Sequence, residues 1–263
     1  MIVSLEAVPR SREALAETVK AAGDFSIIRI INVADLVRFK IRSWEACGIL
    51  GELCPAPGFT CMPHLRARDF DPEKPFPHTA FFRRLGIDRA LVIAGDAEET
   101  ADGASLCGAR AAGPETWKTP TIPFIKKLKL EMPELSVYAA FDPYRSNIRY
   151  ELDYLHAKEE AGAAGFFSQP FFDLRLLEIY AEYLEGRDVY WGISPVLSGK
   201  NRNYWESRNR AIFPKSFRPD LFWNVDFGRR VLDFCEKRGF NLYLMPIKVD
   251  LKPYLSGLLG KEA

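Results

Sequence analysis

Short runs of β-forming residues alternate with longer helical patterns along the chain, and this alternation constrains the fold more than any other feature. Strands separated by helices are typical of parallel sheets, because a parallel pair needs a crossover that a helix usually supplies. Eight strands are expected, at residues 2–7, 25–31, 58–62, 89–94, 135–140, 164–169, 188–194 and 241–246. Eight strands in 263 residues predict one (β/α)8 TIM barrel domain over residues 1–263, although periodicity alone also fits an open doubly wound α/β sheet.

Capping residues and periodicity mark the clearest helices. Ser11 can accept a hydrogen bond at the start of a helix over residues 11–23, and Gly23 can end that helix. Apolar residues at helical spacing, with charged residues on the opposite face, predict two more helices over residues 148–162 and 173–186. These segments are expected to connect successive strands.

Three segments fit this scheme less well. Gly51 and Pro55 are expected to interrupt any helix through the evenly spaced cysteines of residues 47–61. Residues 97–116 are rich in small residues and glycine, and we interpret them as an excursion at the mouth of the barrel. Residues 198–216 are basic and aromatic and are expected to form a solvated helix and turn.

The charge balance and composition argue against several classes of protein. Thirty-six Lys and Arg residues face 35 Asp and Glu residues, so the net charge of +1 predicts neither a nucleic-acid partner nor an anionic membrane partner. No segment reaches the roughly 18 apolar residues of a membrane span and no leader pattern opens the chain, so a cytoplasmic protein is expected. Five cysteines without a CxxC pair predict free thiols, and three histidines without ligand-spaced partners predict no metal site.

A barrel enzyme carries its site at the carboxyl ends of the strands, so the residues there are the candidates. Glu6 has apolar neighbours and is expected to be buried at a pocket, whereas Asp96 fits a helix cap nearly as well as a ligand contact. Gln169 is the sharpest candidate, because a buried amide without a partner costs about 1–3 kcal/mol. The remaining strand ends are expected at Asn32, His64, Phe141, Ser194 and Lys248. The chain has no GxGxxG, GxxxxGK[ST] or GxSxG motif, which leaves Rossmann, P-loop and hydrolase chemistry unsupported.

Five segments at these strand ends resemble one family. They are SLEAVPRS from residue 4, MPHL from 62, AGD from 94, KEEAGAAGFFSQPFFD from 158 and GISPVLS from 192. In this order they are similar to the methylenetetrahydrofolate reductase family. The resemblance implies an oxidoreductase acting on CH–NH groups, which interconverts 5,10-methylenetetrahydrofolate and 5-methyltetrahydrofolate in one-carbon metabolism and methionine biosynthesis.

The resemblance also implies a flavoprotein with bound FAD, NADH as a candidate electron donor and a folate as the small-molecule partner. Glu6 would be the general acid that opens the folate ring, and Asp96 would act beside the flavin. Gln169, Phe217 and Phe222 would contact the substrate. The implied cofactor contacts are Asn32, His64, Gly95, Asp96, Phe141, Glu151, Tyr154 and Lys158.

Departures from the family pattern leave alternatives open. Ala94 stands where the family has arginine, and Glu151, Tyr154 and Ala157 replace residues that hold the cofactor. One alternative is a flavin-free reductase that uses NAD(P)H directly, and another is a non-catalytic folate-binding subunit. The sequence leaves open the reaction direction and the electron partner. It also leaves open a homo-oligomer, because its aromatic-rich segments fit either subunit contacts or packing against the barrel.

Overall fold

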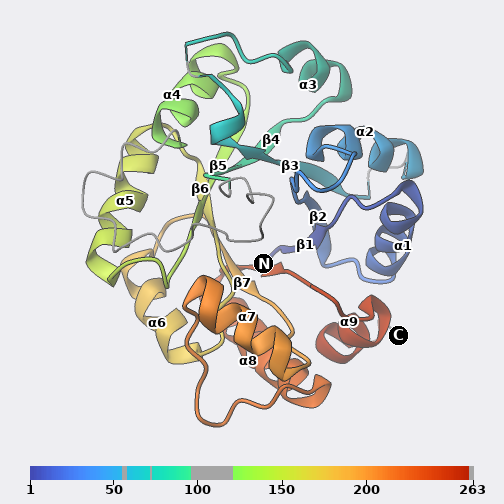
Figure 1. The fold of residues 1–263 in the computed structure, drawn as a ribbon, viewed down its shortest axis with the longest axis vertical. Coiled ribbons are helices and arrows are strands. Elements are labelled where there is room, and N and C mark those ends of the chain that lie inside the picture. The colour runs from blue at the N-terminus through green and yellow to red at the C-terminus, as the bar shows by residue number, and fades with distance from the viewer. Residues whose placement is uncertain (55–57, 72, 96–120, 261–263) are drawn as a thin grey trace, which may run out of the picture.

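A closed barrel of eight parallel strands in sequence order forms the centre of the molecule, which confirms the predicted (β/α)8 TIM barrel (Figure 1). The computed structural model describes residues 1–54, 58–71, 73–95 and 121–260. The strands are β1 (Val3–Ala7), β2 (Ile28–Val33), β3 (Thr60–Arg66), β4 (Arg89–Ile93), β5 (Ser136–Phe141), β6 (Gly165–Ser168), β7 (Val189–Ile193) and β8 (Asn241–Leu244). Because β8 pairs with β1, the sheet has no free edge.

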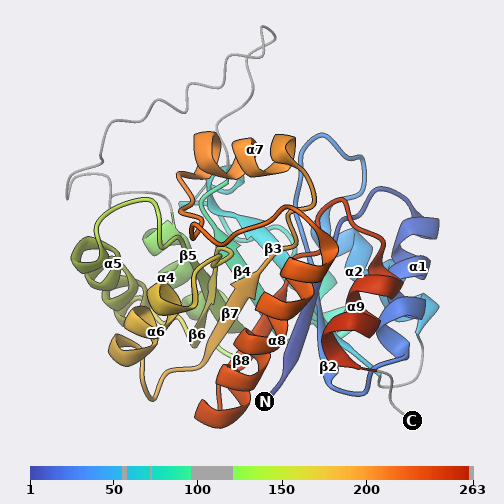
Figure 2. The same ribbon diagram turned by 90° about the horizontal axis from the view of Figure 1, so that it is seen from below.

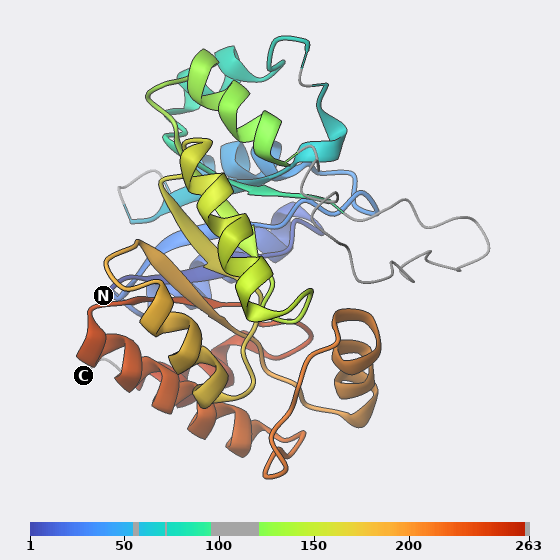
Figure 3. The ribbon, with the colours of Figure 1, turned by 90° about the vertical axis from the view of Figure 1, so that its left-hand side faces the viewer.

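Helices surround the barrel, and α5 and α6 lie next to one another on its outside (Figure 3). In contrast, α7 lies across the end of the barrel where the strands finish (Figure 2). The helices are α1 (Arg12–Gly23), α2 (Ser43–Leu53), the 3-10 helix η1 (Ala67–Asp69), α3 (Thr79–Leu85), α4 (Thr121–Glu131), α5 (Ile148–Glu160), α6 (Leu174–Tyr183), α7 (Gly199–Asn209), α8 (Leu221–Arg238) and α9 (Leu251–Leu259). No helix in the described part of the chain is both long and apolar enough to span a bilayer.

The core has two layers, because successive strand residues point to opposite faces of the sheet. One layer lies between the strands and the surrounding helices. The other fills the barrel and is largely aromatic, with the Phe167 and Tyr190 rings stacked at 4.2 Å and Tyr243 against Phe167 at 5.1 Å. These rings form a packed floor beneath the carboxyl-end mouth, where barrel enzymes carry their sites.

The helix predictions are confirmed where a cap or a long amphipathic pattern supported them. Ser11 accepts from the Ala14 N–H at the start of α1, as its sequence position predicted. The predicted interruption of a helix through residues 47–61 is confirmed, because α2 ends at Leu53 and Cys61 lies in β3, but the helix continues through Gly51. Glycine costs about 1 kcal/mol in a helix, and burial of Trp44 and Leu50 outweighs that cost. The predicted excursion at residues 97–116 lies outside the described residues.

Candidate active site

Three neighbouring strands place polar side chains on the inner side of the barrel mouth. Alternate residues of β1 join the outer core, so Glu6 faces the lumen. Asn32 is the register partner of Glu6 on β2. His64 lies two residues beyond Met62, which is the partner of Asn32 on β3. The ends of β1, β2 and β3 therefore bring a carboxyl, an amide and an imidazole to one part of the mouth.

Glu6 is half-buried and hydrogen-bonded to a second lumen residue. The Tyr243 hydroxyl of β8 donates to Glu6 Oε2. Burial raises the pKa of Glu6 from 4.5 to about 7, and the hydrogen bond from Tyr243 opposes part of that rise. A carboxyl with this pKa is present in both protonation states at neutral pH. It can therefore accept and return a proton.

Asn32 and His64 are buried polar residues with incomplete hydrogen bonding. The Asn32 Nδ2 donates to Ser4 Oγ at 2.8 Å. Asn32 Oδ1 and His64 Nε2 are both buried and have no hydrogen-bond partner among the described residues. Burial lowers the pKa of His64 from 6.5 to about 3, so its imidazole is neutral at physiological pH.

A cavity of about 580 Å³ extends from Glu6 and the loops that follow β1 and β8 along α1 and the start of α9. Arg10 and Lys248 line it, and both side chains belong to exposed residues. Neither has an ion-pair partner within the described part of the chain. Lys248 has a φ of 55°, a left-handed conformation that is uncommon for residues other than glycine and clusters at functional sites. The lining also includes Lys20 and Lys252 and the carboxylates of Glu17, Asp24 and Asp250, so the cavity is mixed in charge.

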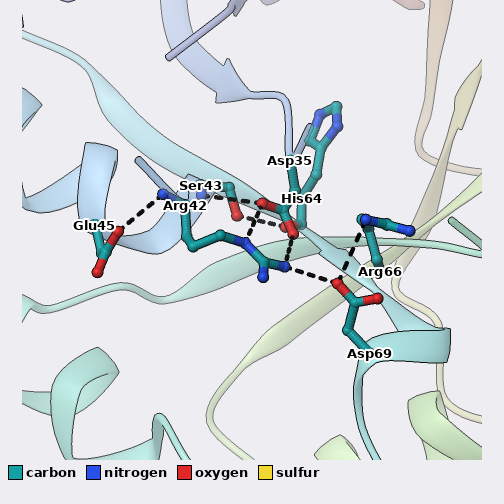
Figure 4. Close-up of polar contacts among 7 residues, drawn as sticks. All are labelled: Asp35, Arg42, Ser43, Glu45, His64, Arg66 and Asp69. Atoms are coloured by element: carbon teal, nitrogen blue, oxygen red, sulfur yellow. Dashed lines mark hydrogen bonds and ion pairs between the residues drawn. The ribbon is translucent and has the colours of Figure 1, made fainter. Parts of the chain in front are cut away.

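An ion-pair network fixes the loop between β2 and α2 against β3 (Figure 4). Arg42 Nε and one Arg42 terminal nitrogen donate to the two Asp35 oxygens at 2.8 and 2.6 Å, and that same nitrogen donates to Asp69 at 2.7 Å. Ser43 Oγ donates to the His64 carbonyl oxygen at 2.6 Å. The network holds the His64 backbone, while the imidazole points away from the ion pairs (Figure 4).

A second charged cluster is enclosed between α5 and the strands. Glu151 is fully buried and accepts from Arg145 at 2.8 Å. The Lys158 ammonium donates to the Ala140 carbonyl and lies 4.0 Å from the centre of the Tyr154 ring. Burial lowers the pKa of Lys158 to about 7. These groups satisfy one another inside the protein, which is the arrangement expected of a structural cluster.

The other predicted site residues are dispersed. Phe141 points out of the barrel into the core, and the half-buried Gln169 donates its backbone N–H to the Phe141 carbonyl at 2.7 Å. Phe217 is buried against Trp223, whereas Phe222 is 86% exposed. Gly95 lies two residues after the end of β4. Asp96 lies outside the described residues.

Sequence reasoning missed several residues of this site. Tyr243 lies within the predicted strand at residues 241–246. Its two-residue spacing from Met245, which shares the lumen cluster, is the signal that its side chain points into the barrel. Arg10 lies in a loop, where no periodicity indicates direction, whereas Lys248 is among the strand-end residues that the sequence predicts. Among the described residues, no group of three or more His, Cys, Asp or Glu side chains could hold a metal ion.

Comparisons with known proteins identify the fold and no family. No family model matches the chain, and no curated protein matches it. A 2,3-dimethylmalate lyase of the PEP mutase/isocitrate lyase superfamily is 11% identical, with a TM-score of 0.57 over 98% of this chain and 78% of its own. An oxaloacetate acetylhydrolase in complex with 3,3-difluorooxalacetate is also 11% identical, with a TM-score of 0.58 over 93% of this chain and 74% of its own. A truncated 3-deoxy-D-arabino-heptulosonate 7-phosphate synthase from Thermotoga maritima is 10% identical, with a TM-score of 0.54 over 98% and 84%.

These findings correct the assignment to the methylenetetrahydrofolate reductases. The solved structures named above are a lyase, a hydrolase and a synthase, and no family model supports a folate reductase. The predicted oxidoreductase activity on CH–NH groups, the folate substrate, the FAD cofactor and the NADH donor were therefore wrong. The flavin-free reductase and the folate-binding subunit, which rest on the same resemblance, are withdrawn with them.

The α5 cluster gives a physical reason for the correction of FAD. The resemblance implied that Glu151, Tyr154 and Lys158 hold the cofactor. Instead, the Glu151 carboxylate binds Arg145 and the Asp142 N–H, and Tyr154 lies against the cations of Arg145 and Lys158. All three residues are at most 2% exposed. A phosphate or ribose would have to displace these internal partners.

Proposed function

We propose that this chain is an enzyme that transfers protons on a small carboxylic acid, in a lyase-type reaction with Glu6 as the general acid–base. The observation that carries the proposal is the half-buried Glu6 carboxyl near the end of β1, which is hydrogen-bonded to Tyr243 and lines the cavity. Its pKa of about 7 suits a residue that must both take and give a proton near neutral pH.

Carbon–carbon cleavage of a 3-hydroxy acid needs a group of this kind. The Glu6 carboxylate would take the hydroxyl proton, and the C–O⁻ would become a carbonyl as the adjacent C–C bond breaks. The electron pair of that bond would remain on the carbon next to the substrate carboxylate. That carbon would then take the proton back from Glu6, which returns the enzyme to its starting state. The products are a carbonyl compound and a shorter carboxylic acid, so atoms and electrons balance.

Two cations from the loops that follow β1 and β8 support an anionic substrate at that side of the cavity. Arg10 and Lys248 line the same cavity as Glu6 and have no ion-pair partner among the described residues. A guanidinium and an ammonium group can bind a carboxylate through charge-assisted hydrogen bonds. The left-handed backbone of Lys248 supports a positioning role, because strain of about 1–3 kcal/mol persists only where the surrounding structure fixes it.

Two structural neighbours are consistent with this class of substrate. One carries the name 2,3-dimethylmalate lyase, and the other is an oxaloacetate acetylhydrolase with a bound oxaloacetate analogue. Both names denote dicarboxylic acids of four-carbon backbone. At 11% identity their fold alone is shared, so the weight of the proposal rests on the groups around Glu6.

Cleavage in deuterated water tests the proposal. The purified protein is incubated with 2,3-dimethylmalate or malate in D₂O, and products are followed by ¹H NMR. Cleavage should release a 2-oxo acid and a shorter acid with one deuterium beside its carboxylate. Glu6→Gln should slow this by about 10²-fold or more, the usual contribution of a general acid–base. Glu17→Gln removes an exposed carboxylate from the same cavity wall and should keep the rate. Unchanged cleavage by Glu6→Gln, or no cleavage of either acid by the wild type, contradicts the proposal.

A further inference from the structure

Two buried polar atoms in the barrel lumen have no hydrogen-bond partner among the residues that the structure describes, and they lie on the adjacent strands β2 and β3, next to β1 with Glu6. They are Asn32 Oδ1 and His64 Nε2, and each residue is at most 5% exposed. Most buried polar atoms in proteins are hydrogen-bonded, because an unsatisfied one opposes folding. Two such atoms together at the mouth of a barrel indicate groups kept for a ligand.

Strand register brings both residues to the same part of the lumen face of the sheet. Asn32 is opposite Glu6 across β1 and β2, and His64 is the diagonal neighbour of Asn32 across β2 and β3. Diagonal neighbours on one face of a sheet are within reach of long side chains. The His64 imidazole also turns away from the Arg42 network (Figure 4), which leaves Nε2 free of those ion pairs.

The remaining hydrogen-bonding capacity of the pair selects one kind of group. Asn32 uses Nδ2 on Ser4 Oγ, so Oδ1 can only accept a hydrogen bond. His64 is neutral, and its Nε2–H tautomer donates. A hydroxyl satisfies both, because its proton goes to Asn32 Oδ1 while its oxygen accepts from His64. A carboxylate has no proton for Asn32, and a methylene group leaves both atoms unpaired.

We propose that Asn32 and His64 form a subsite for a hydroxyl group of the substrate. This inference rests on the proposed function and extends it, since it selects hydroxy acids over the same acids without the hydroxyl. When the reaction begins, the hydroxyl proton leaves its hydrogen bond to Asn32 Oδ1 and moves to Glu6, the register partner of Asn32. The His64 N–H stays on the oxygen as it becomes a carbonyl.

The test compares two probes that differ in one hydroxyl, malate and succinate. Isothermal titration calorimetry on the wild type should show malate binding at least about tenfold more tightly, since a site built for a hydroxyl rejects the analogue that lacks it. His64→Leu should weaken malate binding about tenfold or more and change succinate binding less than twofold. His64→Gln, which can place an amide N–H near the same point, should recover part of the preference for malate.

A measurement without ligand tests the same inference independently. If the two atoms are unpaired in the free protein, Asn32→Leu or His64→Leu removes an unsatisfied group, and at least one should raise the melting temperature. A fall in the melting temperature of both variants would show that these groups serve the fold and would overturn the subsite. Equal binding of malate and succinate by the wild type, or binding of neither, would also overturn it.

The subsite and the proposed function fail differently. A protein that cleaves a hydroxy acid through Glu6 but does not prefer malate over succinate retains the proposed function and loses the subsite. A protein that prefers malate through His64 but transfers no deuterium retains the subsite and loses the proposed reaction. In each case the Glu6→Gln and His64→Leu variants identify which of the two has failed.

Discussion

Replacing Glu6 with glutamine should make the protein more stable at high pH and leave its stability nearly unchanged at low pH. Glutamine has the shape of the protonated side chain and can still accept the hydrogen bond from Tyr243. The wild-type carboxyl has a folded-state pKa of about 7 against 4.5 when exposed. The folded protein therefore holds this proton over a range where the unfolded chain has already released it.

The magnitude follows from linkage between proton binding and folding. Between pH 4.5 and 7 the folded state binds more protons at Glu6, so the free energy of unfolding falls as pH rises through this range. Each unit of pKa corresponds to 1.36 kcal/mol, so the full loss above pH 7 is about 3 kcal/mol. Glu6→Gln removes that loss. Its advantage over the wild type should grow from near zero at pH 4 to about 3 kcal/mol at pH 8.

Urea unfolding at pH 4, 5.5, 7 and 8, followed by circular dichroism, measures this difference. The matched control is Glu17→Gln, which removes an exposed carboxylate from the same cavity and should stay within about 0.5 kcal/mol of the wild type at every pH. A Glu6→Gln effect that is constant across the pH range would refute the reasoning. It would mean that burial does not raise the pKa of Glu6.

Three further predictions concern groups around the barrel. Gly192→Ala should destabilise the protein by about 2 kcal/mol or more in urea unfolding, because the added Cβ would lie 2.5 Å from the carbonyl oxygen at the end of β6. Arg42→Met should cost about 3 kcal/mol in the same assay, since it leaves the Asp35 side chain, which is 0% exposed, without its cation, whereas Arg12→Met breaks an exposed pair and should cost less than about 1 kcal/mol. His64 should keep constant NMR shifts between pH 5 and 8. Because its folded pKa is about 3, the unfolded chain binds a proton at His64 that the folded protein does not. The free energy of unfolding should therefore fall as pH falls from 6.5 towards 3, and His64→Gln should remove this fall.

The fold was predictable because its signal is distributed along the chain. Each strand is a short apolar run, and errors at the ends of single strands do not change their number or order. The second strand was placed at residues 25–31 but forms at Ile28–Val33, and the third continues to Arg66 instead of ending near residue 62. Such shifts leave the barrel unchanged, because closure depends on how many strands pair in sequence.

The site was only partly predictable, because contact between side chains depends on register and on loops. Glu6, Asn32 and His64 could be named from the rule that barrel sites lie at strand ends. Their shared position required the pairing of β1, β2 and β3, which the sequence does not contain. The partners of the loop residue Arg42 lie seven and 27 residues away and follow no periodic pattern.

The resemblance to a folate reductase failed for a reason that the barrel itself explains. Two of its glycines, Gly165 in the KEEAGAAGFFSQPFFD segment and Gly192 in GISPVLS, are required by close packing of neighbouring strands. A Cβ on Gly165 would lie 2.4 Å from the Asp188 carbonyl oxygen, and one on Gly192 would lie 2.5 Å from that of Ser168. Such positions need glycine whatever ligand the barrel binds. Short sequence matches that include them therefore indicate the barrel fold and not a shared function. A functional site is instead indicated by groups that lower the free energy of unfolding. These are the Glu6 carboxyl with its raised pKa and the atoms of Asn32 and His64 that have no partner among the described residues.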